Sequence, residues 1–427
     1  MRIRSIFVTN YKNLIDCEVR PNLIHALTGC NGSGKTNFIQ VLPFIAQLIS
    51  GSDNDRSTLL AAHGWIPSRF GPDAKTTESF KFRLECEIEV NATTWVVEYS
   101  LDFTPFSWVS FSPKQEESFK RIKPLQIARE VLTAKELGKP GQNRTLIKRD
   151  TDGTTTLSYF DSRARPTFPA PGDLSVLKII EVREGQGFAK NYPVIAAFRD
   201  SLIATDVLRL NAAKLIDNSE PFPTAQSRER APGEVVDYFA PFELLSKIKE
   251  SREDWQQYTA WMKILCGIED IMLHTFELPS NDESKPPIGY NMILLRQHER
   301  FIRPSQLSTG HTMLFGILTA LFTFLKSNGV ILLEEPETYL HPKAIIDLLS
   351  ALRETSQRTT VVISTHSPVL LNSLIPSEVT LMKPSRERGF FTTQPVGEIA
   401  EAIEQINRGY TSFGDMLQTN FTLDEAE

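Results

Sequence analysis

The feature of this sequence that most constrains its fold is a glycine-rich loop at residues 29–36, GCNGSGKT, which has the pattern GxxxxGK[ST]. An apolar stretch, Leu23–Leu27, precedes the loop, and helical apolar spacing at Thr36–Ser50 comes after it. Glycine-permitted N–H groups and a helix N-terminus form a positive concavity that suits phosphate. In such a loop Lys35 would reach the β and γ phosphates, and the Thr36 hydroxyl would be available to Mg²⁺. The residues expected to contact a nucleotide here are Asn31, Gly32, Ser33, Gly34, Lys35, Thr36 and Asn37.

A second pattern places acidic side chains at the end of a buried strand. The apolar run Val330–Leu333 is followed directly by Glu334 and Glu335, in the text GVILLEEPE. Ligands of open α/β sheets lie at the carboxyl ends of parallel strands, which is where these carboxylates fall. We expect Glu334 to hold Mg²⁺ and Glu335 to orient or deprotonate an attacking water. The alternative, a solvated helix start, is made less favourable by the apolar strand before it.

Two shorter patterns lie near the acidic strand. Ser308 and Gly310 belong to LSTG at the start of an apolar helix, where small residues can approach a phosphate, although an ordinary helix cap fits equally well. His366 comes after the apolar strand Thr360–Ser364, in the text STHSP. A lone histidine at such a place is more often structural. The order of all four patterns along one chain favours a shared function.

The alternation of elements predicts an α/β fold with a parallel core. Helices at Thr309–Leu325 and Lys343–Glu354 alternate with strands at Val330–Leu333 and Thr360–Ser364, as βαβ units require. A strand at Arg2–Thr9 and a hairpin within residues 80–103 predict an additional antiparallel part. The charged, irregular text between them reads as a mostly helical insertion. We therefore expect one α/β domain built from residues 1–106 and 283–427, which carry all four patterns, with the insertion at residues 107–282.

Composition excludes several other classes of protein. With 427 residues, of which 41% are hydrophobic and 23% charged, the chain has an ordinary globular composition. The four cysteines form no CxxC pair, so neither a zinc site nor a disulfide framework is signalled. The start of the chain lacks the apolar core of a signal peptide, and the longest apolar run is too short to span a bilayer. These features predict a cytoplasmic protein that is not associated with a membrane.

The four patterns together resemble the ATP-binding cassette superfamily. The segments FVTNYKNL, GCNGSGKTN, LSTGH, EEPETYLHP and VVISTHSP are similar to the RecF, SMC and OLD group of ABC ATPases. They are closer still to standalone AAA-type ATPases of bacterial anti-phage defence loci, such as the ATPase subunits of Septu-like and PARIS-like systems. The resemblance covers residues 1–50 and 290–420 and is weak across the insertion. It implies a P-loop NTPase fold of the ABC or SMC-head type.

The resemblance also implies roles for residues and a mode of assembly. Lys35 and Thr36 would bind phosphate and Mg²⁺, Glu335 would be catalytic and His366 would be the γ-phosphate switch, with ATP and Mg²⁺ as cofactors. Ser308 and Gly310 would act in trans, so a homodimer or larger homo-oligomer would sandwich two ATP molecules. Glu334 stands where Asp is commoner, which implies a looser Mg²⁺ contact and slow turnover. Lys12 and Asn13 match a position where relatives contact the nucleotide, although a simple turn is equally compatible.

The length of the chain after His366 bears on the partner. Only 61 residues (427 minus 366) come after this histidine, which leaves no room for a nuclease domain of the OLD type. If the chain belongs to a defence system, its nuclease or toxic activity is expected on a separate effector protein. The locally basic segment Lys114–Arg149 could track nucleic acid, dock an acidic partner or be a solvated arm. The alternatives left open are a RecF/SMC-like DNA-repair ATPase acting directly on DNA, a transporter subunit, and a scaffold that scarcely hydrolyses ATP.

Overall fold

The structure is a computed structural model, and it describes most of the chain. The described residues are 1–51, 79–104, 126–141, 143–158, 166–172, 174–208, 222–223, 241–278, 288–324, 329–356, 359–386, 389–399, 412 and 414.

The first sheet is antiparallel and has eight strands in the order β2-β1-β4-β5-β6-β7-β8-β9. Its strands are β1 (Arg2–Thr9), β2 (Cys17–Val19), β4 (Lys81–Val90), β5 (Thr93–Phe103), β6 (Ile127–Glu136), β7 (Arg144–Arg149), β8 (Thr154–Leu157) and β9 (Thr167–Pro169). The predicted hairpin is confirmed. It turns at Asn91 and Ala92, whose φ angles of 50° and 61° match the tight turns that join twisted antiparallel strands.

The second sheet has the parallel core that the sequence predicts. Its order is β10-β15-β16-β3-β17-β18, and all neighbours are parallel except β17 and β18. The strands are β3 (Ile24–Gly29), β10 (Asp206–Leu208), β15 (Ile331–Glu334), β16 (Val361–Ser364), β17 (Val379–Pro384) and β18 (Phe391–Pro395). The carboxyl ends of β3, β15 and β16 therefore lie side by side.

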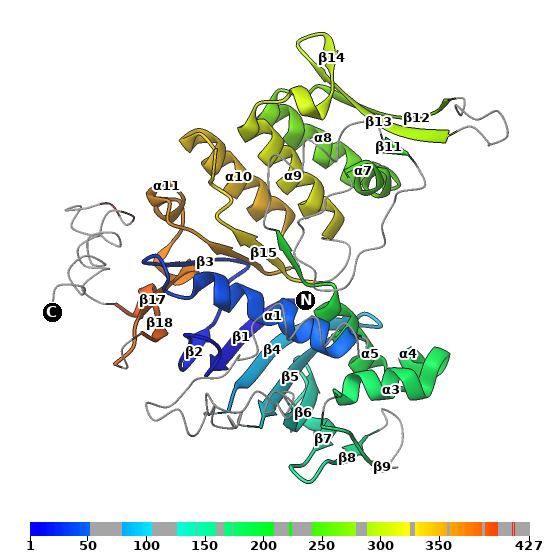
Figure 1. Cartoon of the computed structure of the whole chain (residues 1–427), viewed down its shortest axis with the longest axis vertical. Coiled ribbons are helices and arrows are strands. Elements are labelled where there is room, and N and C mark those ends of the chain that lie inside the picture. The colour runs from blue at the N-terminus through cyan, green and yellow to red at the C-terminus, as the bar shows by residue number, and fades with distance from the viewer. Residues whose placement is uncertain are drawn as a thin grey trace, which may run out of the picture.

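Helices cover both faces of this sheet (Figure 1). Helix α1 (Lys35–Ser50) lies between the two sheets, and α3 (Val176–Glu184), α4 (Phe188–Asn191) and α5 (Pro193–Ile203) lie on the same side. On the opposite face are α7 (Pro241–Lys249), α8 (Arg252–Cys266), α9 (Thr309–Phe324), α10 (Pro342–Thr355) and α11 (Pro368–Asn372). No helix in the described part of the chain is long and apolar enough to cross a membrane.

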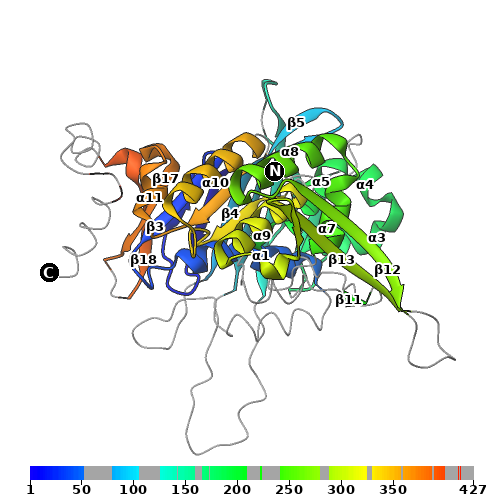
Figure 2. The same ribbon diagram turned by 90° about the horizontal axis from the view of Figure 1, so that it is seen from above.

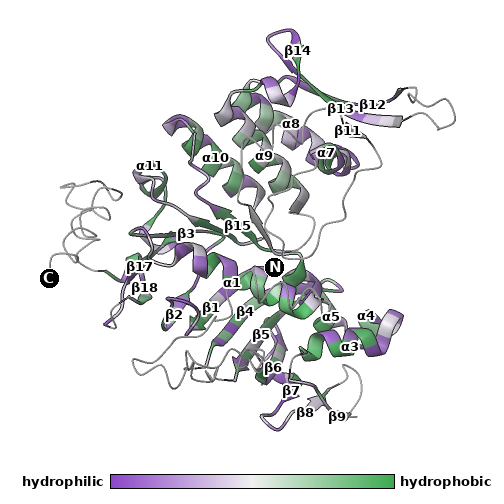
Figure 3. Cartoon of the chain, in the orientation of Figure 1, coloured by the Kyte–Doolittle hydropathy of each residue, from purple (hydrophilic) through white to green (hydrophobic). Residues whose placement is uncertain are grey.

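The strands of the parallel core are apolar throughout because both of their faces are buried. Leu332 packs into the core around α1, whereas its neighbours Ile331 and Leu333 pack into the core around α9. Figure 3 shows this hydrophobic character along the central strands and α9. Each strand is thus held from two sides, which fixes the position of the loops at its carboxyl end.

A third, smaller sheet projects from the body on the side away from β17 and β18, as both Figure 1 and Figure 2 show. It contains β11 (Phe222–Pro223), β12 (Asp270–Leu278), β13 (Ile288–Gln297) and β14 (Arg300–Ile302). Short 3-10 turns lie at Gly185–Gly187, Pro304–Gln306, Pro376–Glu378 and Val396–Glu398.

The segment expected as an insertion differs from the prediction in its first half. Strands β6 to β9 continue the antiparallel sheet and β10 joins the parallel sheet, and the first helix among the described residues of this segment begins at Val176. The boundaries at residues 106 and 282 do not coincide with breaks between sheets, since β6 pairs with β5 and β12 pairs with β13 across them. The sequence concealed β6 because one face of an antiparallel sheet meets water, so buried Leu132 and Ala134 alternate with less buried residues such as Thr133 and Lys135.

Candidate nucleotide-binding site

The glycine-rich loop connects β3 to α1 as predicted, and two of its glycines are required by close contacts. A Cβ atom on Gly29 would lie 2.6 Å from the Met382 carbonyl oxygen. At Gly34, where φ is 90°, it would lie 2.6 Å from Leu14 Cδ2 and 2.8 Å from Asn13 Oδ1. Side chains rarely adopt such a φ angle, so strain and crowding both exclude larger residues there. The loop can therefore stay close to Met382, Leu14 and Asn13.

Lys35 is folded back onto this loop. Its Nζ atom donates hydrogen bonds to the carbonyl oxygens of Gly29 (2.9 Å) and Cys30 (3.0 Å), with Ser33 Oγ at 3.5 Å. Burial lowers the pKa of Lys35 to about 8, partly offset by the nearby acidic groups Cys30, Glu335 and Glu337. The ammonium group thus lies in a partly dehydrated place where an anionic ligand would stabilise its charge.

The turn after β1 supports the loop from the other side. Asn13 donates from Nδ2 to the Gly32 carbonyl oxygen (2.9 Å) and accepts from Asn37 Nδ2 (2.8 Å). Lys12 Nζ donates to Asn37 Oδ1 (3.3 Å) and Gln40 Oε1 (3.4 Å). In this structure the Asn37 side-chain amide is hydrogen-bonded to Lys12 and Asn13. The sequence did not predict the contacts of Asn13 with residues 32–37, because these contacts depend on how β1 is placed in its sheet.

The two acids predicted at the end of β15 lie at the predicted edge of the parallel sheet. Glu334 is opposite Ser364 in the register of β15 and β16, and the Glu335 N–H donates to the Ser364 carbonyl oxygen at 3.0 Å. Glu335 has φ 44°, a left-handed conformation that side chains other than glycine seldom adopt. Such strain is common where a fold must aim a functional side chain.

Glu337 is a site residue that the sequence prediction left out of its roles. One of its carboxylate oxygens, Oε1, accepts from Thr365 Oγ1 at 2.5 Å and from the His366 N–H at 3.1 Å. The other oxygen, Oε2, is buried and has no hydrogen-bond partner among the described residues. Burial raises the pKa of Glu337, although these hydrogen bonds act against the shift. The only sequence signal was its place in EEPE, which does not reveal a contact with the next strand.

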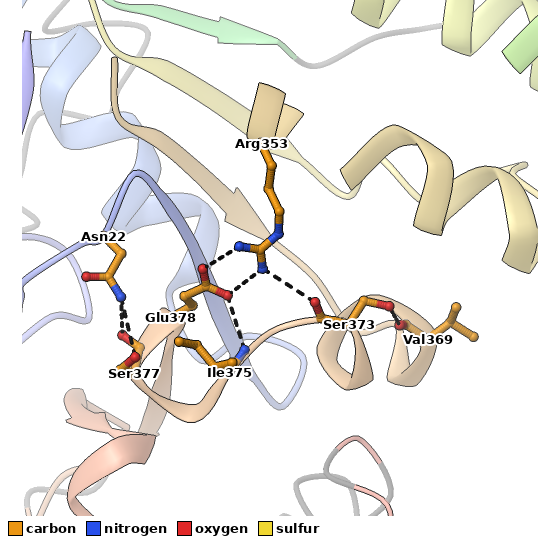
Figure 4. A network of polar contacts seen from close by, with 7 residues as sticks. All are labelled: Asn22, Arg353, Val369, Ser373, Ile375, Ser377 and Glu378. Carbon is orange, nitrogen blue, oxygen red and sulfur yellow. Dashed lines mark hydrogen bonds and ion pairs between the residues drawn. The ribbon is translucent and has the colours of Figure 1, made fainter. Parts of the chain in front are cut away.

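His366 lies at the carboxyl end of β16, close enough to Lys35 and Glu335 for their charges to act on it. Burial and the Lys35 charge lower the pKa of His366, while Glu335 raises it. The segment after His366 is anchored by a polar network at the far end of α11 (Figure 4). There Arg353 donates to both Glu378 oxygens (2.8 and 2.7 Å) and to the Ser373 carbonyl oxygen (3.5 Å). The structure thus brings Lys35, Glu335 and His366 together from three adjacent strands.

Ser308 and Gly310 lie at the start of α9. Ser308 is exposed, and its Oγ accepts from the His311 N–H at 3.4 Å, which is the geometry of a helix cap. A Cβ atom on Gly310 would lie 2.8 Å from the Tyr339 carbonyl oxygen, so this turn of α9 packs directly against the segment after the acids. The contacts described for both residues are with α9 and Tyr339.

The residues at this edge fit a phosphate group and its metal ion. The loop leaves no room for a side chain at Gly29 or Gly34, the Lys35 ammonium group is bonded to the loop carbonyls, and Thr36 is exposed on the first turn of α1. Among the residues that the structure describes, no cluster of three or more His, Cys, Asp or Glu side chains could hold a metal ion alone. A Mg²⁺ ion held by Thr36 and Glu334 would take its remaining ligands from water and from phosphate oxygens.

Comparison with known proteins identifies the family. Residues 24–174 and 182–372 match the family model described as "AAA domain, putative AbiEii toxin, Type IV TA system". The chain belongs to this family. The match confirms the resemblance to AAA-type ATPases that the sequence motifs indicate, and it includes the phosphate loop, the acidic strand and His366 of this AAA domain.

A curated relative and several solved structures are also similar to this AAA domain. Over 95 residues it is 27% identical to the Septu protein PtuA of Bacillus mycoides (strain KBAB4), a match that spans 21% of this chain and 13% of that protein. An SMC head bound to the C-terminal winged-helix domain of ScpA aligns with a TM-score of 0.45 at 12% identity, over 92% of this chain and 98% of that one. The SMC head domain of Thermotoga maritima aligns at 0.39 and 13%, over 92% and 99% of the two chains.

The basic segment Lys114–Arg149 is only partly a free surface. Residues 114–125 lie outside the described residues, and the rest belongs to β6, β7 and their connection. Arg149 is 2% exposed, and its guanidinium donates to the carbonyl oxygens of Leu174 (2.9 Å), Ala170 (3.2 Å) and Pro171 (2.9 Å). Lys139 is paired with Glu136 at 2.7 Å. Arg149 is thus a structural residue whose guanidinium serves the fold. The role of the other bases of the segment stays a prediction.

Proposed function

We propose that this chain is a Mg²⁺-dependent ATPase of the ABC type, which closes as a dimer around ATP and controls a separate effector protein. The observation that carries the proposal is the convergence of Lys35, Glu335 and His366 at the carboxyl ends of β3, β15 and β16. A lysine in a glycine cradle, a carboxylate and a polar switch residue are the parts that phosphoryl transfer to water needs.

Each residue has a distinct task in this proposal. The loop from Asn31 to Asn37 binds the phosphates through its N–H groups, and Lys35 leaves the Gly29 and Cys30 carbonyls to pair with them. Thr36 and Glu334 hold Mg²⁺, which when bound neutralises charge that develops on the phosphate oxygens. Glu335 accepts a hydrogen bond from the attacking water, and His366 donates one toward the γ phosphate.

The dimer is proposed from the exposure of the α9 start. Ser308 is exposed at this helix N-terminus, and Gly310 lets the helix approach Tyr339, which is itself 68% exposed. This surface is available to the nucleotide held by a second copy of the chain. Closing two heads would then require ATP, and hydrolysis would reopen them.

The effector is proposed from the relatives. The family description names a toxin of a type IV TA system, and the similar stretch of PtuA belongs to a Septu protein. We infer an anti-phage defence role in which the ATPase cycle controls a nuclease or toxin on another polypeptide. The alternative is an ATPase that acts directly on DNA, in the manner of DNA-repair heads.

One set of assays separates these functions. The purified chain is incubated with ATP and Mg²⁺, and phosphate release is measured with and without duplex DNA. The proposal expects hydrolysis in both cases, with DNA and RNA left uncut until an effector is added. Direct action on DNA instead expects DNA affinity without a partner, which falls steeply with salt because phosphate contacts release counterions. Metal-dependent cutting of DNA or RNA by the pure chain would contradict the proposal that the nuclease or toxic activity lies on a separate effector protein.

A further inference from the structure

The turn after the acidic strand directs Glu337 toward residues 365–367, the segment after β16 that contains His366 and that we call the histidine loop. Pro336 limits the backbone, the Thr338 N–H donates to the Glu335 carbonyl oxygen (3.1 Å), and the Leu340 N–H donates to the Glu337 carbonyl oxygen (2.9 Å). Two overlapping hydrogen-bonded turns therefore fix the backbone on both sides of Glu337. The carboxylate that they carry is directed back toward the loop after β16.

The histidine loop receives this carboxylate at two adjacent positions. Glu337 Oε1 accepts from the Thr365 hydroxyl and from the His366 N–H. Thr365 in turn donates its own N–H to the Leu27 carbonyl oxygen at 3.0 Å, only two residues before the phosphate loop begins. Its hydroxyl also accepts from the Ser367 N–H at 2.9 Å. A single carboxylate oxygen thus joins the turn after the acidic strand, the histidine loop and the strand that leads into the phosphate loop.

We propose that Glu337 is a positioning residue, which holds the His366 backbone in place so that its ring stays beside Lys35 and Glu335. This inference rests on the proposed ATPase function, because a histidine switch has no task without a phosphate to sense. Position matters because the misplacement of a reacting group by about 1 Å can reduce the rate about 100-fold. Glu337 acts through His366 and Thr365, and no contact with substrate is required of it.

The design of the variants uses the fact that one oxygen makes both contacts. Since Oε1 makes both hydrogen bonds, the single carbonyl oxygen of Glu337→Gln can make them too, whereas Glu337→Ala removes both. Thr365→Val removes one donor and leaves the carboxylate intact. Glu354→Ala, which changes an exposed acid at the end of α10, is the matched control.

Steady-state kinetics give the first readout. Glu337→Ala is expected to lower kcat by about 10- to 100-fold and to change KM by less than about twofold, because the phosphate loop is untouched. Glu337→Gln should restore most of the parental rate, and Glu354→Ala should match the parent. If Gln is as slow as Ala, the negative charge rather than the acceptor is what matters, and the positioning role is wrong. Parental rates in Glu337→Ala would overturn it as well.

Nuclear magnetic resonance of the histidine rings gives a second readout that needs no ATP. The chain has seven histidines, so the His366 signal is assigned by its loss in His366→Gln. Among the described residues, the Lys35 charge lowers the pKa of this ring and the Glu335 charge raises it. Release of the loop in Glu337→Ala would hydrate the ring and raise its pKa toward the ordinary value of about 6.5. Simple loss of a negative charge would lower it instead, and that result would contradict the proposal.

These readouts keep the two proposals apart. If the parental chain neither binds nor hydrolyses ATP, the proposed function fails, while the ring signal still tests whether Glu337 holds the histidine loop. If the parent hydrolyses ATP and the Glu337 variants behave as the parent in both assays, only the positioning role fails. Circular dichroism checks folding, and should Glu337→Ala not fold, Glu337→Gln and Thr365→Val carry the same comparison.

Discussion

The Lys35 ammonium group lies 2.9 Å from the carbonyl oxygen of Gly29, the residue that ends β3 and begins the phosphate loop. The lysine thus donates hydrogen bonds to the carbonyl oxygens of its own loop. Binding of a phosphate group would have to replace this contact and the bond to the Cys30 carbonyl oxygen at 3.0 Å. The bonds to the carbonyl oxygens already use a charged donor, but a phosphate oxygen adds the attraction between two opposite charges.

The first prediction is that Lys35→Ala weakens ATP binding by at least about 30-fold, because truncating one member of a buried charge pair costs about 2–5 kcal/mol. The fold should persist, since the lysine bonds to loop carbonyls that water can satisfy in its place. Binding of a fluorescent ATP analogue measures the affinity and thermal unfolding checks the fold. Unchanged affinity would mean that this loop is not the nucleotide site.

The second prediction concerns protons. Because burial lowers the pKa of Lys35 to about 8, the free protein holds roughly half a proton on this group at pH 8, and a bound polyphosphate would favour full protonation. ATP binding should therefore take up about half a proton at pH 8 and almost none at pH 6.5. Calorimetry in two buffers of different ionisation enthalpy measures the uptake, with Glu335→Gln used to prevent turnover.

The same pKa shift affects stability with a definite sign. A lysine whose folded pKa lies below its unfolded value binds fewer protons in the folded state, so the unfolding free energy should rise as pH increases from about 8 toward 10.5. Lys35→Ala should flatten this part of the pH dependence relative to the parent. A parallel change in both proteins would assign the effect to other groups.

The third prediction separates binding from hydrolysis. Glu335→Gln should keep ATP affinity within about threefold and lower kcat by about 100-fold or more, since the amide cannot accept the proton of the attacking water. The trapped state should elute as a dimer in the presence of ATP. Turnover at the parental rate would show that Glu335 is not the carboxylate that activates the water, and Glu334 would be tested next.

The phosphate loop and the acidic strand were predictable because each is a local pattern. Residues 29–36 carry the glycines, the lysine and the helix start within one turn, and Glu334 directly follows the apolar residues that bury β15. The Glu337 contact was not predictable, since it joins residues separated by 28 and 29 positions and depends on the register of β15 and β16. Local propensity contains no information about such a register.

The antiparallel sheet was predictable only in part for a related reason. The β4–β5 hairpin has apolar alternation and a two-residue turn, whereas in β6 a charged residue, Glu130, occupies a buried position. Glu130 is buried at 0% exposure because its carboxylate has partners supplied by distant residues. Tyr99 OH (2.8 Å) and Ser175 Oγ (2.7 Å) donate to Oε1, and the Val176 N–H (2.8 Å) donates to Oε2. A buried acid in a strand therefore reads as a surface residue until its partners are known.

The fourth prediction concerns this buried carboxylate. Glu130→Ala should reduce the unfolding free energy by about 3–5 kcal/mol, because it leaves three donors buried without an acceptor. Tyr99→Phe, which removes one donor and keeps the ring, should cost only about 1–1.5 kcal/mol. Denaturant unfolding measures both, with exposed Arg129→Ala on the same strand as the control. Equal effects of Glu130→Ala and Arg129→Ala would contradict the role of Glu130 as an anchor of α3.

The last prediction tests whether the site is shared between two chains. Ser308 and Gly310 are placed by α9 and Tyr339, and in the proposed dimer they face the nucleotide of the partner copy. Ser308→Arg should abolish hydrolysis because a long cation would block this approach, while ATP binding to the loop of the same chain stays intact. Lys35→Ala is inactive because its own loop no longer binds ATP, although its Ser308 is unchanged.

A mixture of the two chains forms some dimers with one doubly damaged site and one intact site. Hydrolysis should then return to as much as about a quarter of the parental rate if chains pair at random and each site works independently. Activity per chain should also fall on dilution, as a concentration series would show. A mixture that stays inactive although mixed dimers are detected would contradict the shared site, as would activity per chain that is constant down to concentrations where the protein is monomeric.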